Sequence, residues 1–497
     1  MKRVVKYLLV VLCTLSLVVI YGPVSSLAAK VEKKAKPAKA AAVVKGTVAE
    51  KVAKANDAFD ANKMSDMSDF DPNNPVVPTG DTIKIALVNA FSGPAAYNGQ
   101  LHFAPIAWAV HDINKRGGIL VDGKKKKIEL IKADHMAKAE QCKKICERMI
   151  LQEKVHILMG TPGSNMMKIM YEVGNKYKIP VWNYSSMSDE MHDAENFSRY
   201  TFMGSYSTES VSRAMAYYFG QIRKKEKKFY ILNQDYGFGH LAAEAFKKGL
   251  KEYYPEAQVV GEDYHKLFLT DFAPYLTKIK AAGAEIVYSN DWAPDSNNLK
   301  KQARQMNITT PFAGNYIVVA GPVMAEMGVE GTAGSILIDQ FDIQNEFSNP
   351  GYVKFHKAWL EQYKKWKTPY SSIVYRHTST GFLASYCMQT YWLLSAIERA
   401  QSVDPERLIK VLEGDTYQYV NGKIVKMRAC DHKIIQDLCV TELVPPDQQK
   451  ISYTIPPYYW AKEFAYAGKW EVVPAEKALP MMDQRLDRCK GKTGWGE

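Results

Sequence analysis

The stretch Ile83-Lys84-Ile85-Ala86-Leu87-Val88, followed by Asn89-Ala90-Phe91-Ser92-Gly93-Pro94, decides the fold of this 497-residue chain. Its first half is a short apolar run of the length typical of a buried strand, and Gly93-Pro94 turn the chain into a loop. Residues 101–116 then carry apolar side chains at helical spacing and stop at Gly117-Gly118, a signal for a helix C-terminus. A buried strand followed by such a helix is the repeating unit of a parallel sheet covered by helices.

The same alternation continues in two runs, one before and one after residue 200. Periodicity predicts strands over 128–133, 155–159, 179–184, 229–233, 258–264 and 285–289, and helices over 138–152, 165–177, 208–222, 240–253, 271–282 and 295–306. The sequence therefore predicts an α/β fold of two doubly wound parallel-sheet lobes. The first lobe is expected to comprise residues 81–203 and about 340–428, and the second 204–339 and about 429–497.

The region before the first strand has the pattern of an export signal. Met1–Lys6 is basic, and the apolar run over 7–20 is shorter than the roughly 20 residues that span a bilayer. We predict a cleaved signal peptide over 1–29 and a periplasmic protein. Residues 30–80 are rich in Lys and Ala and then in Asp, and we expect them to form a tether outside the fold.

The net charge of +12 is concentrated at the N-terminus. Nine of these charges lie in the first 54 residues, which leaves about +3 for the rest of the chain. A basic tail explains this distribution better than a nucleic-acid groove. The hydrophobic content of 46% excludes a disordered chain, and seven cysteines are too few for a disulfide scaffold.

Export permits disulfides among the six cysteines that follow the predicted signal peptide. Cys430 and Cys439 flank a segment with the pattern of a tight β excursion, and we predict that they form a disulfide. Cys142 and Cys146 lie four residues apart on a predicted helix, but no His or Cys follows at zinc-site spacing. We expect no metal there, and either two buried thiols or a local bridge. Cys387 lies in an apolar helix and is predicted to be a core residue.

The loops after the predicted strands carry hydroxyl groups, and ligands of parallel sheets bind beyond these strand ends. Gly160-Thr-Pro-Gly-Ser164 and Tyr184-Ser-Ser-Met-Ser188 each lead into a helix. Serine at a helix start is often only a cap, but two such entries on neighbouring strands favour a shared carboxylate or phosphate site at Ser164, Ser185 and Ser186.

Aromatic side chains lie on or beside the same loops. For any one of them a core or surface role is the more frequent one. Together they would line a site for a partly apolar ligand: Tyr97, Trp182, Tyr236, Trp292 and Tyr316. We find no Gly-x-Ser-x-Gly elbow, no Walker loop, no His-Glu-x-x-His and no Gly-x-Gly-x-x-Gly after the first strand, so we predict neither an enzyme nor a cofactor.

Several short motifs resemble, in order and spacing, those of periplasmic solute-binding proteins of the branched-chain amino acid (leucine/isoleucine/valine) type, which serve ABC importers. The resemblance extends from about Asp81 to Leu443. Its motifs are Phe91-Ser92-Gly93-Pro94 with Tyr97 and Gly99, Asp112-Ile-Asn114 before Gly117-Gly118, Asp235-Tyr236-Gly237-x-Gly239, Thr270-Asp271-Phe272 with Ala281-Ala-Gly283-Ala284, Leu299-x-x-Gln302-Ala303, and Asp431-His432.

The resemblance implies two lobes that are joined by three crossing strands and close on a ligand. It implies that Ser164 binds the ligand carboxylate and that the backbone of Ser186 holds an amino acid. The pocket aromatics would be Tyr97, Tyr236 and Trp292.

Two positions depart from the family pattern. Met187 stands where the family has a hydroxyl group that helps to bind the carboxylate. Tyr316, or Asn315 if the alignment shifts by one residue, stands where the family has the Glu that neutralises the ligand ammonium.

These features predict a monomeric, extracytoplasmic solute-binding protein that delivers a small ligand to an inner-membrane ABC permease and binds no nucleic acid. The alternative is a sensory receptor subunit of the same fold, and a secreted hydrolase would need a nucleophile and base that the sequence does not offer. Because a buried ammonium needs a counter-charge, we predict an apolar carboxylate or a modified amino acid as ligand. A leucine-like amino acid would require the charge of Asp291, Asp295 or Asp339.

Overall fold

The computed structural model describes residues 56–494 except 293, 318–321, 341–348, 364, 368–379 and 449–464. The side chains of residues 97, 322–326, 380–384, 466 and 467 also lie outside the described part. All described residues belong to one compact unit.

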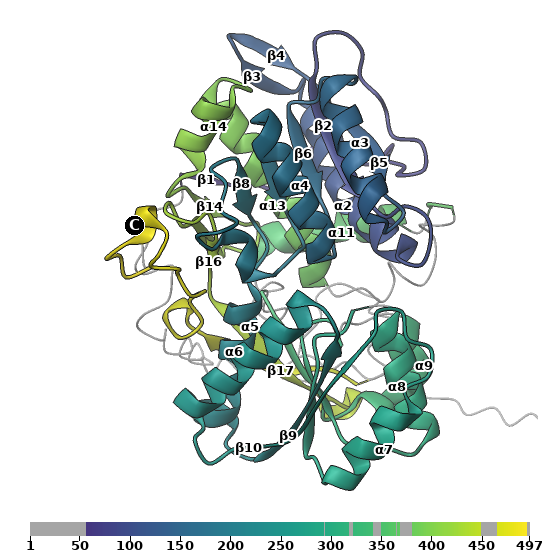
Figure 1. Cartoon of the computed structure of the whole chain (residues 1–497). Coiled ribbons are helices and arrows are strands. Elements are labelled where there is room, and N and C mark those ends of the chain that lie inside the picture. Colours follow the sequence, from purple (N-terminus) through teal and green to yellow (C-terminus); the bar gives the residue numbers. More distant parts are fainter. Residues whose placement is uncertain are drawn as a thin grey trace, which may run out of the picture. The chain divides into compact units, whose positions relative to one another are not determined.

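The first lobe is built on a five-stranded parallel sheet in the order β5-β2-β6-β7-β8 (Figure 1). The decisive stretch of sequence is β2, an interior strand between β5 and β6, and its side chains alternate between two cores, as strand geometry requires. Ile85 and Leu87 face the core formed with α2 and α13, whereas Ala86 and Val88 face the core formed with α3 and α4. The elements are β2 (Ile83–Asn89), α2 (Ala96–Lys115), β5 (Ile128–Asp134), α3 (Ala139–Leu151), β6 (Ile157–Gly160), α4 (Ser164–Tyr177), β7 (Val181–Asn183), β8 (Thr201–Met203) and α13 (Thr380–Ala400).

The second lobe is built on a seven-stranded sheet in the order β10-β9-β11-β12-β13-β17-β18. The first five strands are parallel and the last two antiparallel, so this sheet is mixed. Helices α5 and α6 cover one face, and α7 and α8 cover the other. The elements are α5 (Thr208–Tyr217), β9 (Lys228–Gln234), α6 (Gly237–Tyr253), β10 (Gln258–His265), α7 (Ala273–Ala282), β11 (Ile286–Tyr288), α8 (Asp295–Gln305), β12 (Phe312–Gly314), α9 (Pro322–Thr332), β13 (Ile336–Asp339), β17 (Leu438–Val444) and β18 (Tyr466–Val473).

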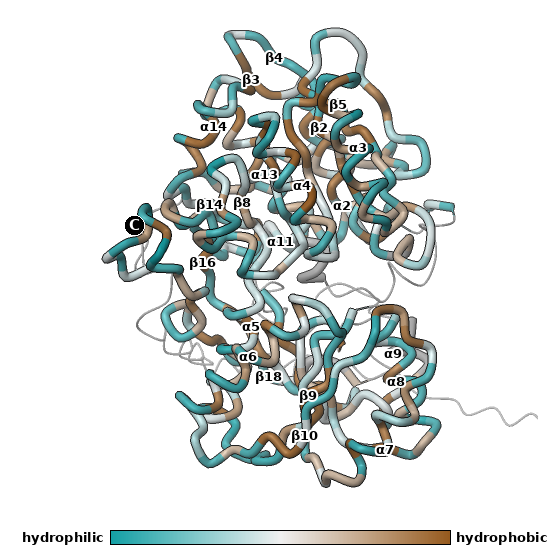
Figure 2. Tube along the Cα trace, viewed as in Figure 1, coloured by the Kyte–Doolittle hydropathy of each residue, from teal (hydrophilic) through white to brown (hydrophobic). Residues whose placement is uncertain are grey.

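Two smaller sheets complete the described part. One has the order β1-β14-β15-β16, and the other is the hairpin β3-β4. Figure 2 shows the turn and β4 of this hairpin as hydrophilic, as the three lysines of β4 require, whereas β2 is hydrophobic. The remaining elements are β1 (Asp57–Ala58), β3 (Ile119–Val121), β4 (Lys124–Lys126), α11 (Pro350–Tyr363), α14 (Pro405–Leu412), β14 (Thr416–Gln418), β15 (Ile424–Met427) and β16 (Ile434–Ile435), with a π-helical turn over Tyr218–Arg223 and short 3-10 turns such as Asp189–His192.

The segment 56–80 is part of the fold, so the predicted tether is wrong for these residues. Strand β1 pairs with β14, and Met67 and Phe70 are buried in the core. The ring of Phe70 packs against Trp108 and Trp366, and the Trp366 indole donates a hydrogen bond to the Phe70 carbonyl at 3.0 Å. The sequence prediction failed because sparse apolar residues among aspartates have no helical or strand period. Residues 30–55 lie outside the described residues.

In the described residues the chain passes between the two lobes at three places before β17, and the C-terminal segment returns to the first lobe after β18. The first follows β8, the second begins at Gln340 after β13, and the third connects β16 to β17. Met203 forms a parallel bridge with Lys433, which links the first crossing to the segment that leads into the third. The Lys423 ammonium donates hydrogen bonds to the carbonyls of Gln340 and Asp437, which links the second crossing to the third. The third crossing therefore lies near residues 436–437, after the predicted boundary at about 429.

The predicted disulfide between Cys430 and Cys439 is wrong. Cys430 is bonded to Cys489, and Cys439 is a buried thiol outside any disulfide. The reason is the third crossing: Cys430 precedes it, whereas Cys439 lies on β17 opposite Asp339 of β13. Cys142, Cys146 and Cys387 are buried thiols, as expected for core residues.

The C-terminal segment lies against the first lobe after leaving β18. The Ala194 amide donates a hydrogen bond to Asp483 at 3.0 Å, and Arg485 forms an ion pair with Glu195. Arg428, which is buried, donates to the Pro480 carbonyl at 2.9 Å. The predicted packing of residues 444–497 on the second lobe is therefore found in part: β18 joins its sheet, the Lys477 carbonyl accepts a hydrogen bond from Tyr253 of α6, and Ala478 belongs to its core.

Candidate functional site

The first-lobe part of the candidate site consists of the loops after β6 and β7. Gly163 has a φ of 86°, a conformation that favours glycine, and it precedes the first helical residue, Ser164. Ser164 is 6% exposed, and the cap position itself is occupied by Gly163. The first N–H groups of a helix have no carbonyl partners within it, so this loop offers donors for a carboxylate.

The loop after β7 is held by the side chain of Asn183. Its amide oxygen accepts hydrogen bonds from the backbone N–H groups of Ser185 and Ser186, at 3.1 and 2.8 Å, and its amide nitrogen donates to the Ser186 carbonyl. The Ser186 hydroxyl donates to the Thr161 carbonyl at 2.5 Å, which fastens the β6 and β7 loops to each other. The N–H and C=O groups of Ser186 are therefore already bonded, and this residue positions the loops.

The second-lobe part is an aromatic wall beyond the ends of β9, β11 and β12. The indole of Trp292 donates a hydrogen bond to the Tyr236 hydroxyl at 3.0 Å. The ring of Phe238 lies 5.8 Å from that of Tyr236 and 6.3 Å from that of Tyr316, centroid to centroid. Three of the aromatic residues named from sequence, Tyr236, Trp292 and Tyr316, therefore belong to one connected surface. Of the other two, Tyr97 lies in α2 with its side chain outside the described part, and Trp182 is buried in the core of the first lobe.

The two parts contact each other directly. The hydroxyl of Tyr316 donates a hydrogen bond to the Ser185 carbonyl at 3.3 Å. The Asn315 amide nitrogen approaches the Met187 sulfur at 3.2 Å. A Cβ on Gly237 would lie 3.1 Å from the Glu190 carboxylate, so glycine there permits this acid to approach the start of α6. Both positions that depart from the family pattern, Met187 and Tyr316, thus lie at this contact.

Two further tyrosines belong to the site, and the sequence analysis did not find them. Tyr386 of α13 packs against Tyr184, with ring centroids 5.3 Å apart, and hydrogen-bonds to Ser185. Tyr206 comes from the first crossing, and burial raises the pKa of its hydroxyl well above the ordinary value, with a further contribution from Tyr316 and Asp339. Tyr206 follows β8, which the apolar periodicity did not predict, and Tyr386 lies within helix α13, so the rule of strand-end loops did not identify them. The site is rich in neutral tyrosine hydroxyls.

The three aspartates considered as counter-charges differ in their surroundings. Asp291 is fully buried and bonded to His265 at 2.7 Å. Asp295 accepts hydrogen bonds from the Gln234 amide at 2.8 Å and from the Phe268 N–H at 2.9 Å. Burial raises the pKa of both carboxyls. Asp339, at the end of β13, is close enough to Tyr206 and Tyr316 for its charge to raise their pKa values.

Among the described residues, the one group of side chains close enough to hold a metal ion is Cys430, Asp431 and Cys489. Two of these three are joined in the disulfide, so this group offers no thiolate ligands. Nor does any helix in the described ranges combine the length and the apolar character needed to cross a bilayer.

Comparison with known proteins agrees with this geometry. Residues 82–449 match the family model described as periplasmic binding protein. A relative named amino acid binding protein, from Pseudomonas aeruginosa, is 25% identical over 346 residues, which cover 69% of this chain and 85% of the relative. A Leu/Ile/Val-binding protein from Escherichia coli is 22% identical over 69% of this chain and 86% of its own length.

Two solved structures share the fold. The closed conformation of a leucine-, isoleucine-, valine-, threonine- and alanine-binding protein from Brucella ovis has a TM-score of 0.67 at 19% identity, covering 82% of this chain and 98% of that one. A solute-binding protein of an ABC transporter from Rhodopseudomonas palustris, in complex with benzoate, has a TM-score of 0.62 at 18% identity, covering 82% and 100%.

The fold and the two-sided site define a solute-binding protein of two α/β lobes. Because the family model matches about three quarters of the sequence, the chain belongs to the periplasmic binding protein family. The relatives that match this chain include proteins named amino acid binding protein and Leu/Ile/Val-binding protein.

Proposed function

We propose that this protein is the non-enzymatic, monomeric receptor of an ABC importer, which binds a small apolar carboxylate between its lobes and delivers it to an inner-membrane permease. In this proposal residues 1–29 are a cleaved signal peptide and the mature protein acts in the periplasm. The observation that carries the proposal is the junction of Tyr316 with Ser185, where an aromatic wall of one lobe meets the hydroxyl-rich loops of the other.

The carboxylate end of the ligand would be held at the start of α4. Ser164 and the N–H groups beside Gly163 offer hydrogen-bond donors there, and the helix dipole favours a negative charge. Met187 removes one hydroxyl donor from this end, at a cost of about 1 kcal/mol, which the remaining donors can tolerate.

The body of the ligand would lie against aromatic and thioether groups. Trp292, Tyr236 and Phe238 form one side, and Met187 is 2% exposed on the other. Such a surface favours apolar atoms, with tyrosine hydroxyls available to orient a polar substituent. Relatives and structural neighbours bind amino acids or benzoate, according to their names, so both kinds of carboxylate are within the range of this fold.

An amino acid would place its ammonium near Asp339. The charge of Asp339 acts on the Tyr206 and Tyr316 hydroxyls, next to the contact with Ser185, whereas the charges of Asp291 and Asp295 act on the Tyr236 hydroxyl. A leucine-like amino acid is thus the second ligand class, and its recognition would depend on Asp339.

A thermal-shift screen followed by calorimetry tests the function. Branched aliphatic acids, benzoate and leucine should be compared at equal concentration, because a ligand that binds only the folded state raises the melting temperature by mass action. We expect at least one carboxylate to give a saturable shift with unchanged ligand recovered at the end. Chemical conversion of the ligand, or no shift with any member of these classes, would contradict the proposal.

A further inference from the structure

The C-terminal segment 474–494, which we call the strap, is anchored in both lobes. Ala478 is buried in the core of the second lobe, among side chains of α5 and α6. Cys489 is joined by the disulfide to Cys430 of the first lobe. In Figure 1 the strap belongs to the yellow end of the chain, marked C. Residues 479–482 therefore cross from one lobe to the other.

At this crossing the strap takes part in a closed ring of four hydrogen-bonded residues. The Met481 N–H donates to the Glu209 carboxylate at 2.8 Å, and the Glu209 N–H donates to the Asp189 carboxylate at 2.9 Å. The Lys433 ammonium closes the ring, because it donates to Asp189 at 3.2 Å and to the Met481 carbonyl at 3.1 Å. Both backbone polar groups of Met481 therefore take part in the ring.

The four residues of the ring come from four different parts of the chain. Asp189 begins the 3-10 turn between β7 and β8 in the first lobe, and Glu209 lies in the first turn of α5 in the second lobe. Lys433 belongs to the segment that leads into the third crossing, where it forms the bridge with Met203. A change in the angle between the lobes moves Asp189 relative to Glu209, and so it strains or breaks the ring.

The bonds of the ring differ in how deeply they are buried. The side chains of Lys433 and Asp189 are only 4% and 6% exposed, and a buried charge that loses its partner remains desolvated without compensation. The bond from Met481 to Glu209, in contrast, is exposed at the surface. The strap can therefore be released at Glu209 without disturbing the buried ion pair.

We propose that the strap is a positioning element that holds the two lobes closed, with the bond from Met481 to Glu209 as the point at which it locks them. In this structure the lobes are in contact at Tyr316 and Ser185, and the strap adds a further connection to the three crossings. It lies beyond residues 82–449, the part of the chain that matches the family model.

Two consequences follow for the equilibrium between open and closed lobes. The strap raises the closed fraction of the ligand-free protein, because its bonds are made only when the lobes are together. It also slows the dissociation of a ligand held between the lobes, since release requires opening. The second consequence rests on the proposed function, whereas the first does not.

Distances between spin labels on the two lobes test the strap in the ligand-free protein. The labels are attached through Glu172→Cys in α4 and Glu244→Cys in α6, two exposed positions on helices that lie next to each other. The free cysteines of the described residues are buried, so the labels react at the introduced positions. The measurement is made at pH 8, because burial raises the pKa of the Glu209 carboxyl to about 7. We expect a single short distance to predominate.

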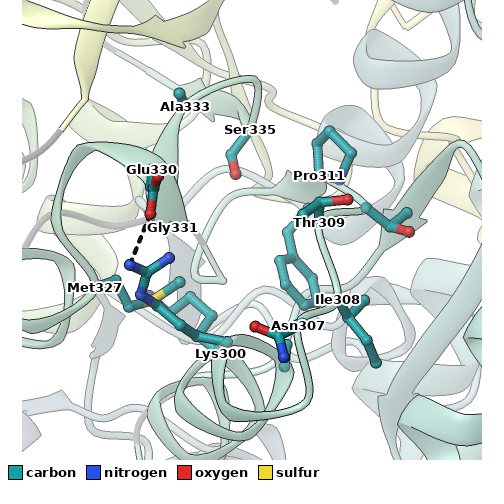
Figure 3. A pocket seen from close by; sticks show the side chains of 14 residues that line it. Lys300, Asn307, Ile308, Thr309, Pro311, Met327, Glu330, Gly331, Ala333 and Ser335 are labelled. Atoms are coloured by element: carbon teal, nitrogen blue, oxygen red, sulfur yellow. Dashed lines mark hydrogen bonds and ion pairs between the residues drawn. The ribbon is translucent and has the colours of Figure 1, made fainter.

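Glu209→Ala removes the acceptor of the strap. It should raise the ratio of open to closed molecules about tenfold, as expected for the loss of one hydrogen bond to a charged group. Glu209→Gln keeps an acceptor oxygen and should retain most of the short distance. Glu330→Ala is the matched control: Figure 3 shows Glu330 at a cavity of the second lobe, where its 3.0 Å ion pair with Arg304 joins α9 to α8 within one lobe.

Equal open fractions in Glu209→Ala and Glu330→Ala would overturn the proposal, as would a predominantly long distance in the protein that carries only the labels. A purely structural role of the strap would lower the free energy of unfolding of Glu209→Ala and leave its distances unchanged, which would also overturn it.

Stopped-flow binding of benzoate and 4-methylpentanoate tests the second consequence. Glu209→Ala should raise the dissociation rate of a bound carboxylate about tenfold and leave the association rate nearly unchanged. If neither carboxylate binds while the label distances change as expected, the proposed function fails and the strap remains supported. Tight binding with equal dissociation rates in Glu209→Ala and Glu330→Ala would contradict the role of the strap.

Discussion

Removing the disulfide between Cys430 and Cys489 should destabilise the protein by several kcal/mol. The bond closes a loop of 59 residues. In the loop-entropy model a loop of this length contributes about 4 kcal/mol at 25 °C, because the cross-link reduces the conformational freedom of the unfolded chain. For a chain of this length the corresponding drop in melting temperature is on the order of 4 °C. The assay is denaturant unfolding of the double variant Cys430→Ala/Cys489→Ala beside the unaltered protein.

Cys439→Ala is the matched control, since Cys439 is also buried but lies outside any disulfide. Its cost should be about 1 kcal/mol, the typical effect of a single core substitution. Peptide mapping without reduction should recover Cys430 joined to Cys489. A double variant within about 1 kcal/mol of the unaltered protein, or a peptide that joins Cys430 to Cys439, would refute this reasoning.

Three further predictions concern the candidate site and the buried His102 of α2, whose ring packs against those of Tyr184 and Tyr386. Ligand binding should change the tryptophan fluorescence through Trp292, so the variant Trp292→Phe should lose most of this change. Trp182→Phe is the control, because Trp182 is buried in the core of the first lobe, and it should retain the change. An unaltered ligand-induced change in Trp292→Phe would place the ligand elsewhere. Burial lowers the pKa of the His102 imidazole in the folded state to about 3, from 6.5 in the unfolded chain. Between these two pH values the unfolded state binds a proton that the folded state does not, so the free energy of unfolding decreases as the pH falls from 6.5 toward 3. His102→Gln should reduce that slope by up to about 1.4 kcal/mol per pH unit, as measured by urea unfolding at several pH values, and an unchanged slope would contradict the assignment. Asp339→Asn should lower the affinity for leucine relative to its ammonium-free analogue by about tenfold, whereas Asp291→Asn should not change this ratio; calorimetry of both ligands decides.

The regular elements were predictable because their signals are local. The run Ile83–Val88 is strand β2 almost to the residue, and the predicted helix over 240–253 differs from α6 only in its earlier start at Gly237. Apolar spacing within one element is set by which face packs on the sheet, and this information is contained in about ten consecutive residues.

The features that the sequence analysis missed depend on contacts between distant segments. The partner of Cys430 is set by where the third crossing lies, and residues 56–80 are ordered by Trp108 and Trp366 rather than by their own pattern. Ser185 was found because it follows a predicted strand, and Tyr316 because it is an aromatic residue at a position that departs from the family pattern. Tyr206 was missed because it follows β8, which no apolar run predicted, and Tyr386 because it lies within a helix. The role of Ser186 was also out of reach, because only the structure shows that Asn183 and Thr161 already use its polar groups.

Calorimetry of leucine against 4-methylpentanoate, which is leucine without its amino group, tests the central claim most directly. The site supplies donors for a carboxylate and neutral tyrosines around it, so removal of the ammonium should leave the affinity equal or higher. We predict that 4-methylpentanoate binds at least as tightly as leucine. Tight binding of leucine with no detectable binding of 4-methylpentanoate or benzoate would contradict the account.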